Sequence, residues 1–203
     1  MSLERGAWAQ GFALVAGVDE AGRGALAGPV VAAAVVMPES PRVPHVTDSK
    51  CLTAARRETL AVEISDVALS FGIGVISAAM VDTVNILRAT HMAMRRALEQ
   101  LSPRPDLALI DGNSLPRLDC SARAVVDGDR LCYSIAAASI LAKTYRDRVM
   151  GHMALLYPGY GLDSHKGYGT EEHRDAIARL GPCPVHRMSF EPFRSAAQLL
   201  LDV

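Results

Sequence analysis

Two runs of apolar residues, each about as long as one β-strand, lie close together near the start of the chain. They cover residues 13–18 and 30–37, and the segment between them contains three glycines and one proline. These residues favour turns, because glycine reaches positive φ and proline combines a fixed φ with the absence of an N–H group. We therefore expect the two runs to form a β-hairpin.

The rest of the chain alternates between strand and helix patterns and then becomes entirely helical. Short apolar runs predict further strands at 67–78, 106–110 and 123–126. Helical spacing predicts helices at 53–65, 81–101, 133–156, 171–180 and 192–201. Thr53 is the expected N-cap of the first helix. This order of elements predicts an α/β fold with a small helical C-terminal extension.

The composition is that of a folded protein. Half of the 203 residues are hydrophobic and 21% are charged, which excludes a disordered or collagen-like chain. The formal net charge is −1, so any affinity for nucleic acid must come from a local patch. No apolar stretch reaches the roughly 18 residues of a membrane-spanning helix. The four cysteines have no CxxC spacing and are interpreted as free thiols, so we expect a cytoplasmic protein.

An acidic pair, Asp19 and Glu20, directly follows the first apolar run and precedes Gly22, Arg23 and Gly24. Neighbouring side chains in a regular strand point to opposite faces, so both carboxylates can serve one site only where the strand ends. The glycines would let the backbone approach a ligand closely. The alternative is a solvated acidic turn.

Further carboxylates follow two of the other predicted strands. Asp111 comes after residues 106–110, and Asp127 and Asp129 come after residues 123–126. Carboxylates that converge from several strand ends suit Mg²⁺ or Mn²⁺, and two such ions about 3.5–4 Å apart can activate water and stabilise a leaving oxygen. Each of these aspartates is also typical of a turn, and spacing alone does not establish that they converge.

A third set of residues suits contact with phosphate groups, because its members carry hydroxyl or ammonium groups. They are Ser49, Lys50, Ser139, Lys143 and Lys166. Lys143 could instead pair with Asp147 four residues along a helix, and Ser139 could be a small packing residue. Tyr168 lies between two glycines, where its ring could stack on a sugar or base or simply cover the surface. His173 and His186 share no metal-ligand spacing and are interpreted as core or surface histidines.

Together these segments resemble the ribonuclease HII family, the type 2 ribonucleases H that cut RNA in RNA/DNA hybrids and ribonucleotides embedded in duplex DNA. Seven segments match in the family's order: GVDEAGRGALAGPVVAAAVV, TDSKCLT, NILRATHMAM, LALIDGN, DGDRLCYSIAAASILAKTYRD, YPGYGLDSHKGYGT and HRMSFEPF. The resemblance implies a ribonuclease H-like fold with a mixed five-stranded sheet flanked by helices. It also implies a catalytic core over residues 1–160, followed by a substrate-contacting loop and helical extension over 161–203.

The resemblance also implies roles for individual residues. The catalytic and metal-binding carboxylates would be Asp19, Glu20, Asp111 and Asp129, where Asp129 rather than Asp127 matches the family's fourth carboxylate. The residues that recognise the junction between a ribonucleotide and a deoxynucleotide would be Gly22, Arg23, Gly24 and Tyr168. Those that hold the nucleic-acid backbone would be Lys50, Ser139, Lys143 and Lys166.

For the reaction, the resemblance implies two Mg²⁺ or Mn²⁺ ions. The substrates would be RNA/DNA hybrids and DNA containing ribonucleotides, and cleavage 5′ to the ribonucleotide would leave 3′-hydroxyl and 5′-phosphate ends. We expect a monomer.

The sequence departs from the family pattern at two positions. Ala25 stands where the family commonly has proline, which could loosen the turn that presents Arg23, and Cys51 replaces a lysine that could contact a phosphate. Three other interpretations stay open on the residues alone. They are another nuclease or integrase-like enzyme of the same fold class, an α/β nucleic-acid-binding module with acidic turns, and a globular domain without a metal site.

Overall fold

A five-stranded β-sheet forms the centre of the molecule. The computed structural model describes residues 1–41, 43–47 and 49–195. Its strands are β1 (Val15–Ala21), β2 (Val30–Val36), β3 (Ser70–Ile76), β4 (Leu107–Asp111) and β5 (Ser121–Val125), in the spatial order β3-β2-β1-β4-β5. Pairing is antiparallel from β3 to β1 and parallel from β1 to β5, so the sheet is mixed. The predicted ribonuclease H-like sheet is confirmed.

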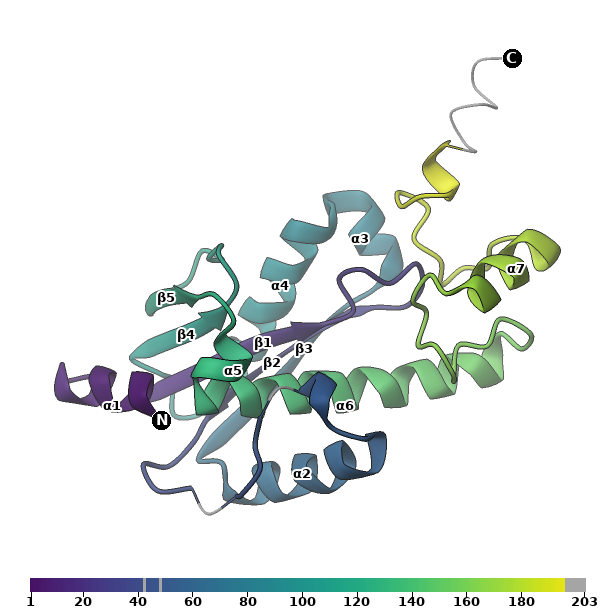
Figure 1. The fold of residues 1–203 in the computed structure, drawn as a ribbon. Helices are drawn as coiled ribbons and strands as arrows, with labels where there is room; N and C mark the ends of the chain where they lie inside the picture. Colours follow the sequence, from purple (N-terminus) through teal and green to yellow (C-terminus); the bar gives the residue numbers. More distant parts are fainter. Residues whose placement is uncertain (42, 48, 196–203) are drawn as a thin grey trace.

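Helices cover both faces of this sheet (Figure 1). They are α1 (Ser2–Ala9), α2 (Ala54–Val67), α3 (Ala78–Val84), α4 (Ile86–Glu99), α5 (Gly128–Leu131), α6 (Tyr133–Leu156) and α7 (Glu171–Leu180), with a 3₁₀ turn η1 at Ser49–Cys51. Helix α4 packs on one face of β2 and β3, while α6 packs on the opposite face of β1 and β2, with α2 on its outer side.

Small side chains set the close spacing between sheet and helices. Strand β2 is buried along its whole length, and its side chains alternate between the two helical layers. On β3, a Cβ atom at Gly72 or Gly74 would overlap backbone carbonyls of α4. Glycine therefore lets α4 lie directly against this strand.

The β1–β2 hairpin and the start of helix α2 confirm two predictions. Strands β1 and β2 pair in register from Ala16 opposite Val36 to Ala21 opposite Val31. The Thr53 side chain accepts a hydrogen bond from the Arg56 N–H at 3.2 Å, as an N-cap does.

Two predicted elements have different bounds. The single helix expected at 81–101 is divided at Asn85, whose φ of 69° interrupts α3 and whose side chain caps α4 by accepting from the Arg88 N–H at 3.1 Å. The strand expected to begin at residue 67 begins at Ser70, because α2 continues to Val67. The prediction missed both because asparagine and small apolar residues are compatible with either structure.

The N-terminal helix α1 was not predicted, and Glu4 holds it in place. This buried carboxylate accepts hydrogen bonds from the Ser134 N–H at 2.8 Å and the Ser134 hydroxyl at 2.6 Å. Helix α6 has no capping side-chain bond from its own N-cap residue, Cys132. Glu4 therefore caps α6 from 130 positions away.

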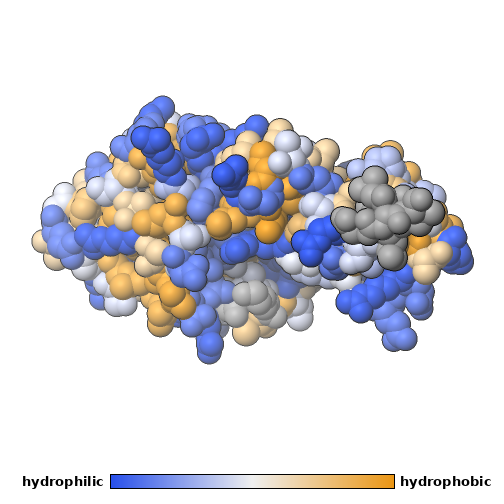
Figure 2. All heavy atoms as spheres, turned by 90° about the horizontal axis from the view of Figure 1, so that it is seen from above, coloured by the Kyte–Doolittle hydropathy of each residue, from blue (hydrophilic) through white to orange (hydrophobic). Residues whose placement is uncertain are grey.

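The region after α6 forms a smaller lobe. Helix α7 lies at the far end of α6, beyond the sheet (Figure 1), and a view from above shows this lobe projecting from the larger body (Figure 2). Its apolar contacts include Met150, Leu162 and Ile177. The helix predicted at 192–201 lies mostly outside the described residues. In the described part of the chain, no helix is both long enough and apolar enough to cross a lipid bilayer.

Candidate active site

A cleft of about 240 Å³ opens where β1 and β4 end. Since these strands are parallel, their carboxyl ends lie at the same edge of the sheet. Most of the predicted site residues line this cleft, and they are Asp19, Glu20, Gly22, Arg23, Gly24, Asp111, Ser139, Lys143 and Tyr168, together with Ser49. The fold thus brings together three of the four predicted carboxylates and most of the predicted substrate contacts.

The carboxylates in the cleft oppose one another electrostatically. Burial raises the pKa of Asp19 well above its ordinary value, and the charges of Glu20 and Asp111 raise it further, against a hydrogen bond from Ser139. Burial also raises the pKa of Glu20, although Arg23 acts in the opposite direction. A divalent cation in the cleft would relieve this repulsion.

The two carboxylate oxygens of Glu20 differ in their hydrogen bonding. Its Oε1 accepts from a guanidinium nitrogen of Arg23 at 3.1 Å, whereas its buried Oε2 has no hydrogen-bond partner among the described residues. A buried oxygen of this kind suits a hard cation such as Mg²⁺ or Mn²⁺. Within the described ranges, however, no three acidic, histidine or cysteine side chains already stand close enough to enclose an ion. The donor chemistry therefore fits such ions, although the carboxylates on the cleft do not enclose an ion in their present positions.

Asp111 and Asp129 come from neighbouring elements. Asp111 ends β4, and its Oδ1 accepts from the Gly128 N–H at 2.7 Å. The next residue, Asp129, is buried in the first turn of α5 and does not line the cleft. Asp127 precedes α5 in the left-handed conformation, with φ 54° and ψ 38°, as expected of a turn residue. The assignment of Asp129 as the fourth ligand stays a prediction.

Arg187 stabilises the glycine-flanked turn of residues 22–24 through hydrogen bonds to backbone carbonyls. Its side chain is fully buried and donates to the Arg23 carbonyl at 2.9 Å and to the Gly28 carbonyl at 3.0 and 2.9 Å. Burial and the neighbouring Arg146 lower the pKa of Arg187 to about 10, so it stays charged at neutral pH. Sequence reasoning missed this residue, because a single arginine in an irregular segment gives no signal of burial.

Arg146 of α6 joins the segment after this turn to the loop that carries Tyr168. The fully buried guanidinium donates to the carbonyls of Pro29 at 3.0 Å, Ala27 at 3.1 Å and Lys166 at 3.0 Å. Sequence reasoning missed this residue as well, because its partners Pro29 and Ala27 lie more than a hundred positions away.

Tyr168 stands beside the turn at the rim of the cleft. Its backbone forms a β-bridge with Ala25, and its ring is 37% exposed. The ring centroid lies 5.3 Å from Cζ of Arg146 and 5.9 Å from Nζ of Lys143. The ring is therefore held at the surface by its backbone and by two cations, with part of it open to a ligand.

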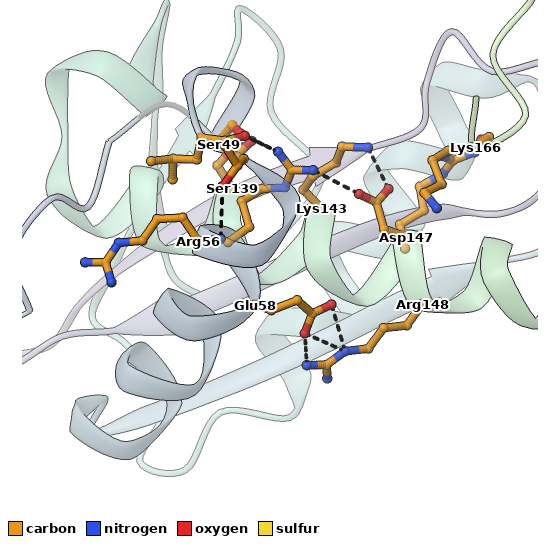
Figure 3. Close-up of polar contacts among 12 residues, drawn as sticks. Ser49, Arg56, Glu58, Ser139, Lys143, Asp147, Arg148 and Lys166 are labelled. Carbon is orange, nitrogen blue, oxygen red and sulfur yellow. Dashed lines mark hydrogen bonds and ion pairs between the residues drawn. The ribbon is translucent and has the colours of Figure 1, made fainter. Parts of the chain in front are cut away.

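Hydroxyl and charged groups extend from the cleft along α6 (Figure 3). The hydroxyls of Ser49 and Ser139 lie 3.0 Å apart, so Ser139 does more than fill space. Lys143 pairs with Asp147 at 2.6 Å, as the alternative for this lysine required, while it also lines the cleft. Arg57 of α2 binds the same carboxylate at 3.3 Å and was not predicted.

Of the two other residues predicted to contact the nucleic-acid backbone, the structure describes the side chain of Lys166, which is labelled in Figure 3. Lys166 lines a separate cleft of about 160 Å³ between α2 and α6, and its ammonium donates to the Asp163 carbonyl. The side chain of Lys50 lies outside the described part of the structure, as does the neighbouring Asp48. Neither lysine role is tested by this arrangement.

Comparisons with known proteins agree with one another. A family model described as Ribonuclease HII matches residues 16–192. The chain is 49% identical over 195 residues to a ribonuclease HII of Dehalococcoides mccartyi, covering 95% of this chain and 92% of that protein. It is 54% identical over 194 residues to a ribonuclease HII of Parvibaculum lavamentivorans, covering 95% and 70%.

Solved structures show the same similarity. The ribonuclease H2 from Pyrococcus horikoshii OT3 superposes with a TM-score of 0.76 at 25% identity, covering 94% of this chain and all (100%) of that chain. RNase HII in the PCNA:RNase HII complex from Archaeoglobus fulgidus gives 0.73 at 26% identity, covering 88% and 95%. Bst-RNase HIII in complex with Mn²⁺ shares the fold, with a TM-score of 0.70 at 18% identity over 94% and 71%.

Proposed function

The chain belongs to the ribonuclease HII family, a family of nucleases that act on RNA/DNA hybrids, and we propose that it also incises duplex DNA 5′ to an embedded ribonucleotide. One observation carries this proposal. The turn of residues 22–24 and the ring of Tyr168 lie on the same cleft as Asp19, Glu20 and Asp111. A sugar recognised by the turn and the ring would therefore have its phosphate beside the carboxylates.

Asp19, Glu20, Asp111 and Asp129 would hold divalent ions, for which we propose two Mg²⁺ or Mn²⁺. Three observations support this set. The family depends on divalent metals, the carboxylates in the cleft repel one another, and Glu20 has a buried oxygen with no hydrogen-bond partner in the described part of the chain. When bound, such ions lower the pKa of an attacking water and stabilise charge on the departing 3′ oxygen. The products would carry 3′-hydroxyl and 5′-phosphate ends.

The remaining residues of the cleft would bind and orient the substrate. The 2′-hydroxyl group distinguishes a ribonucleotide from its neighbours, and the backbone of Gly22–Gly24 can approach it without side chains in the way. The Tyr168 ring would stack on the adjacent sugar or base. Lys143 and Ser139, with lesser roles for Lys50 and Lys166, would hold phosphates and so fix the register of the strand.

Product lengths from three end-labelled duplexes test the proposal. The duplexes are all DNA, DNA with one ribonucleotide, and an RNA/DNA hybrid, each with Mg²⁺, Mn²⁺ or a chelator. We expect metal-dependent incision 5′ to the lone ribonucleotide, lost in Asp19→Asn and Asp111→Asn. The control Asp119→Asn changes an exposed carboxylate away from the cleft and should cut normally. Cleavage of the hybrid alone would contradict the junction role of the turn and of Tyr168.

A further inference from the structure

Three histidine rings form a cluster behind Tyr168, outside the carboxylate cleft. His173 is fully buried and His186 is 3% exposed. The ring of His165 stacks on that of His173 with centroids 4.4 Å apart, and His186 follows at 5.3 Å from His173. The proposed cleavage mechanism does not use these residues.

The proton on His186 is fixed by the backbone beside it. The N–H of Cys183 donates to Nδ1 of His186 at 2.9 Å. Two N–H groups cannot face each other at that distance, so Nδ1 is an acceptor and the nearby Cys183 carbonyl, at 3.2 Å, receives no proton from it. A neutral His186 therefore carries its proton on Nε2.

The proton on His186 also determines the tautomer of His173. Nε2 of His186 lies 3.2 Å from Nε2 of His173 and donates to it, so Nε2 of His173 is an acceptor. The proton of a neutral His173 is then on Nδ1, which lies 3.0 Å from the carbonyl oxygen of Tyr168. The hydrogen bonds thus run in one direction, from Cys183 through two neutral rings to the backbone of Tyr168.

The same reasoning places the proton of His165 on Nε2. Its Nδ1 accepts from the Gly167 N–H at 3.2 Å, and its Nε2 lies 2.8 Å from the Tyr160 carbonyl and donates to it. The stacked pair of His165 and His173 therefore binds the backbone of Gly167 and of Tyr168.

Protonation of His173 would break its link to His186 but would leave the Nδ1–H bond to the Tyr168 carbonyl in place. A proton on its Nε2 would face the Nε2–H of His186 at 3.2 Å, so two donors would oppose each other. Burial, with His165 and His186 adding to it, lowers the pKa of His173 to about 4, and burial lowers that of His186 as well. Other titratable or charged groups near the cluster in the described part of the chain include Cys183, Tyr160, Glu172 and Arg174, and Lys166 and Arg187 directly follow His165 and His186.

We propose that His173 is a positioning residue for Tyr168: the Nδ1–H of its ring holds the Tyr168 carbonyl, and the hydrogen bond from His186 orients that ring. The effect on ribonucleotide recognition rests on the proposed function. The hydrogen-bond chain itself does not, so the two are tested separately.

Nitrogen-15 NMR of the histidines tests the chain without any substrate. We expect His173 as the Nδ1–H tautomer and His186 as the Nε2–H tautomer, with His173 still neutral at about pH 5. The exposed His152 serves as the reference histidine. An Nε2–H tautomer of His173, or a charged His173 at neutral pH, would overturn the proposal.

Two variants of His173 test whether its hydrogen bond to the carbonyl positions Tyr168. His173→Asn keeps an N–H donor attached to Cγ but does not titrate, whereas His173→Leu keeps bulk without a donor. The readout is the ratio of cleavage at a single ribonucleotide to cleavage of a long hybrid, which cancels effects common to both substrates. We expect His173→Leu to lower this ratio about tenfold, and His173→Asn to stay near the unmodified protein.

A second readout keeps the proposal decidable if the unmodified protein does not cut at single ribonucleotides, or if His173→Leu fails to fold. The carbonyl ¹³C shift of Tyr168 should stay near its unmodified value in His173→Asn, which keeps a donor, and should move in His173→Phe, which keeps an aromatic ring without one. An unchanged shift in His173→Phe would overturn the proposal. The control His152→Leu, at an exposed histidine that also faces a backbone carbonyl, should leave both the ratio and the shift unchanged.

Discussion

Gly22 and Arg146 occupy a space that has no room for another side chain. A Cβ atom on Gly22 would overlap the guanidinium of Arg146, and Gly22 itself has a φ of +92°. A cation on the long helix α6 therefore limits the shape of the turn at the cleft, so the fold and the turn depend on the same contact.

Gly22→Ala should lower the free energy of unfolding by about 2–3 kcal/mol, because the positive φ and the overlap each add strain. Chemical denaturation measures this change. Gly24→Ala is the matched control for stability, since Gly24 has no positive φ and nothing within 4 Å of its Cβ position. A Gly22→Ala protein as stable as Gly24→Ala would contradict the packing described here.

Arg146→Met should cost about 3 kcal/mol of unfolding free energy, because three buried carbonyls lose a charged donor. Arg148→Met, two residues along the same helix, removes only an exposed pair with Glu58 and should cost less than about 1 kcal/mol. Equal costs for the two variants, measured by urea unfolding, would show that the buried network adds nothing.

Asp19→Asn should lower cleavage at least about a hundredfold through loss of a proposed metal ligand. In the presence of a chelator, the same variant should unfold at a higher temperature than the unmodified protein, since one of three mutually repelling carboxylates becomes neutral. Thermal unfolding with and without Mn²⁺ measures both effects. A lower melting temperature in chelator would argue against the repulsion.

Glu4→Gln should cost about 1–2 kcal/mol at neutral pH by removing the charge that caps α6. Burial raises the pKa of Glu4, but its hydrogen bonds to Ser134, to its own backbone and to Cys132 together leave the pKa below the ordinary 4.5. The charged form is thus favoured in the folded state, and its contribution is present above pH 4.5 and is lost as the pH falls through the folded pKa. The difference in unfolding free energy between the unmodified protein and Glu4→Gln should become smaller as the pH falls below the folded pKa of Glu4. A difference that does not change with pH would exclude the charge of Glu4 as its cause.

Tyr168→Ala should reduce cleavage at a single ribonucleotide about five- to hundredfold, which corresponds to about 1–3 kcal/mol of stacking. Tyr168→Phe keeps the ring and should stay within about twofold. Because the ring is 37% exposed, neither change should alter the melting temperature greatly. If the two variants cleave equally well, the ring has no stacking role.

Local patterns were sufficient to predict the strands, the Thr53 cap and the ligand candidates at the strand ends, since each depends on neighbours in the sequence. The division at Asn85 was missed because its positive φ has no strong signature in the pattern. Glu4, Arg146 and Arg187 were missed for a different reason. Each acts on backbone groups more than a hundred positions away, and no periodicity records such a contact.

Arg187 donates to the carbonyl of Arg23, which lies 164 positions earlier in the chain. During synthesis, the first hairpin and its turn are made long before this donor exists. A nascent chain that ends before Arg187 already contains Asp19, Glu20 and Asp111, but the Arg23 carbonyl in the turn lacks this donor. Cleavage competence should therefore arise only near the end of translation, and C-terminal truncation before this residue should silence the nuclease even where the sheet has already folded.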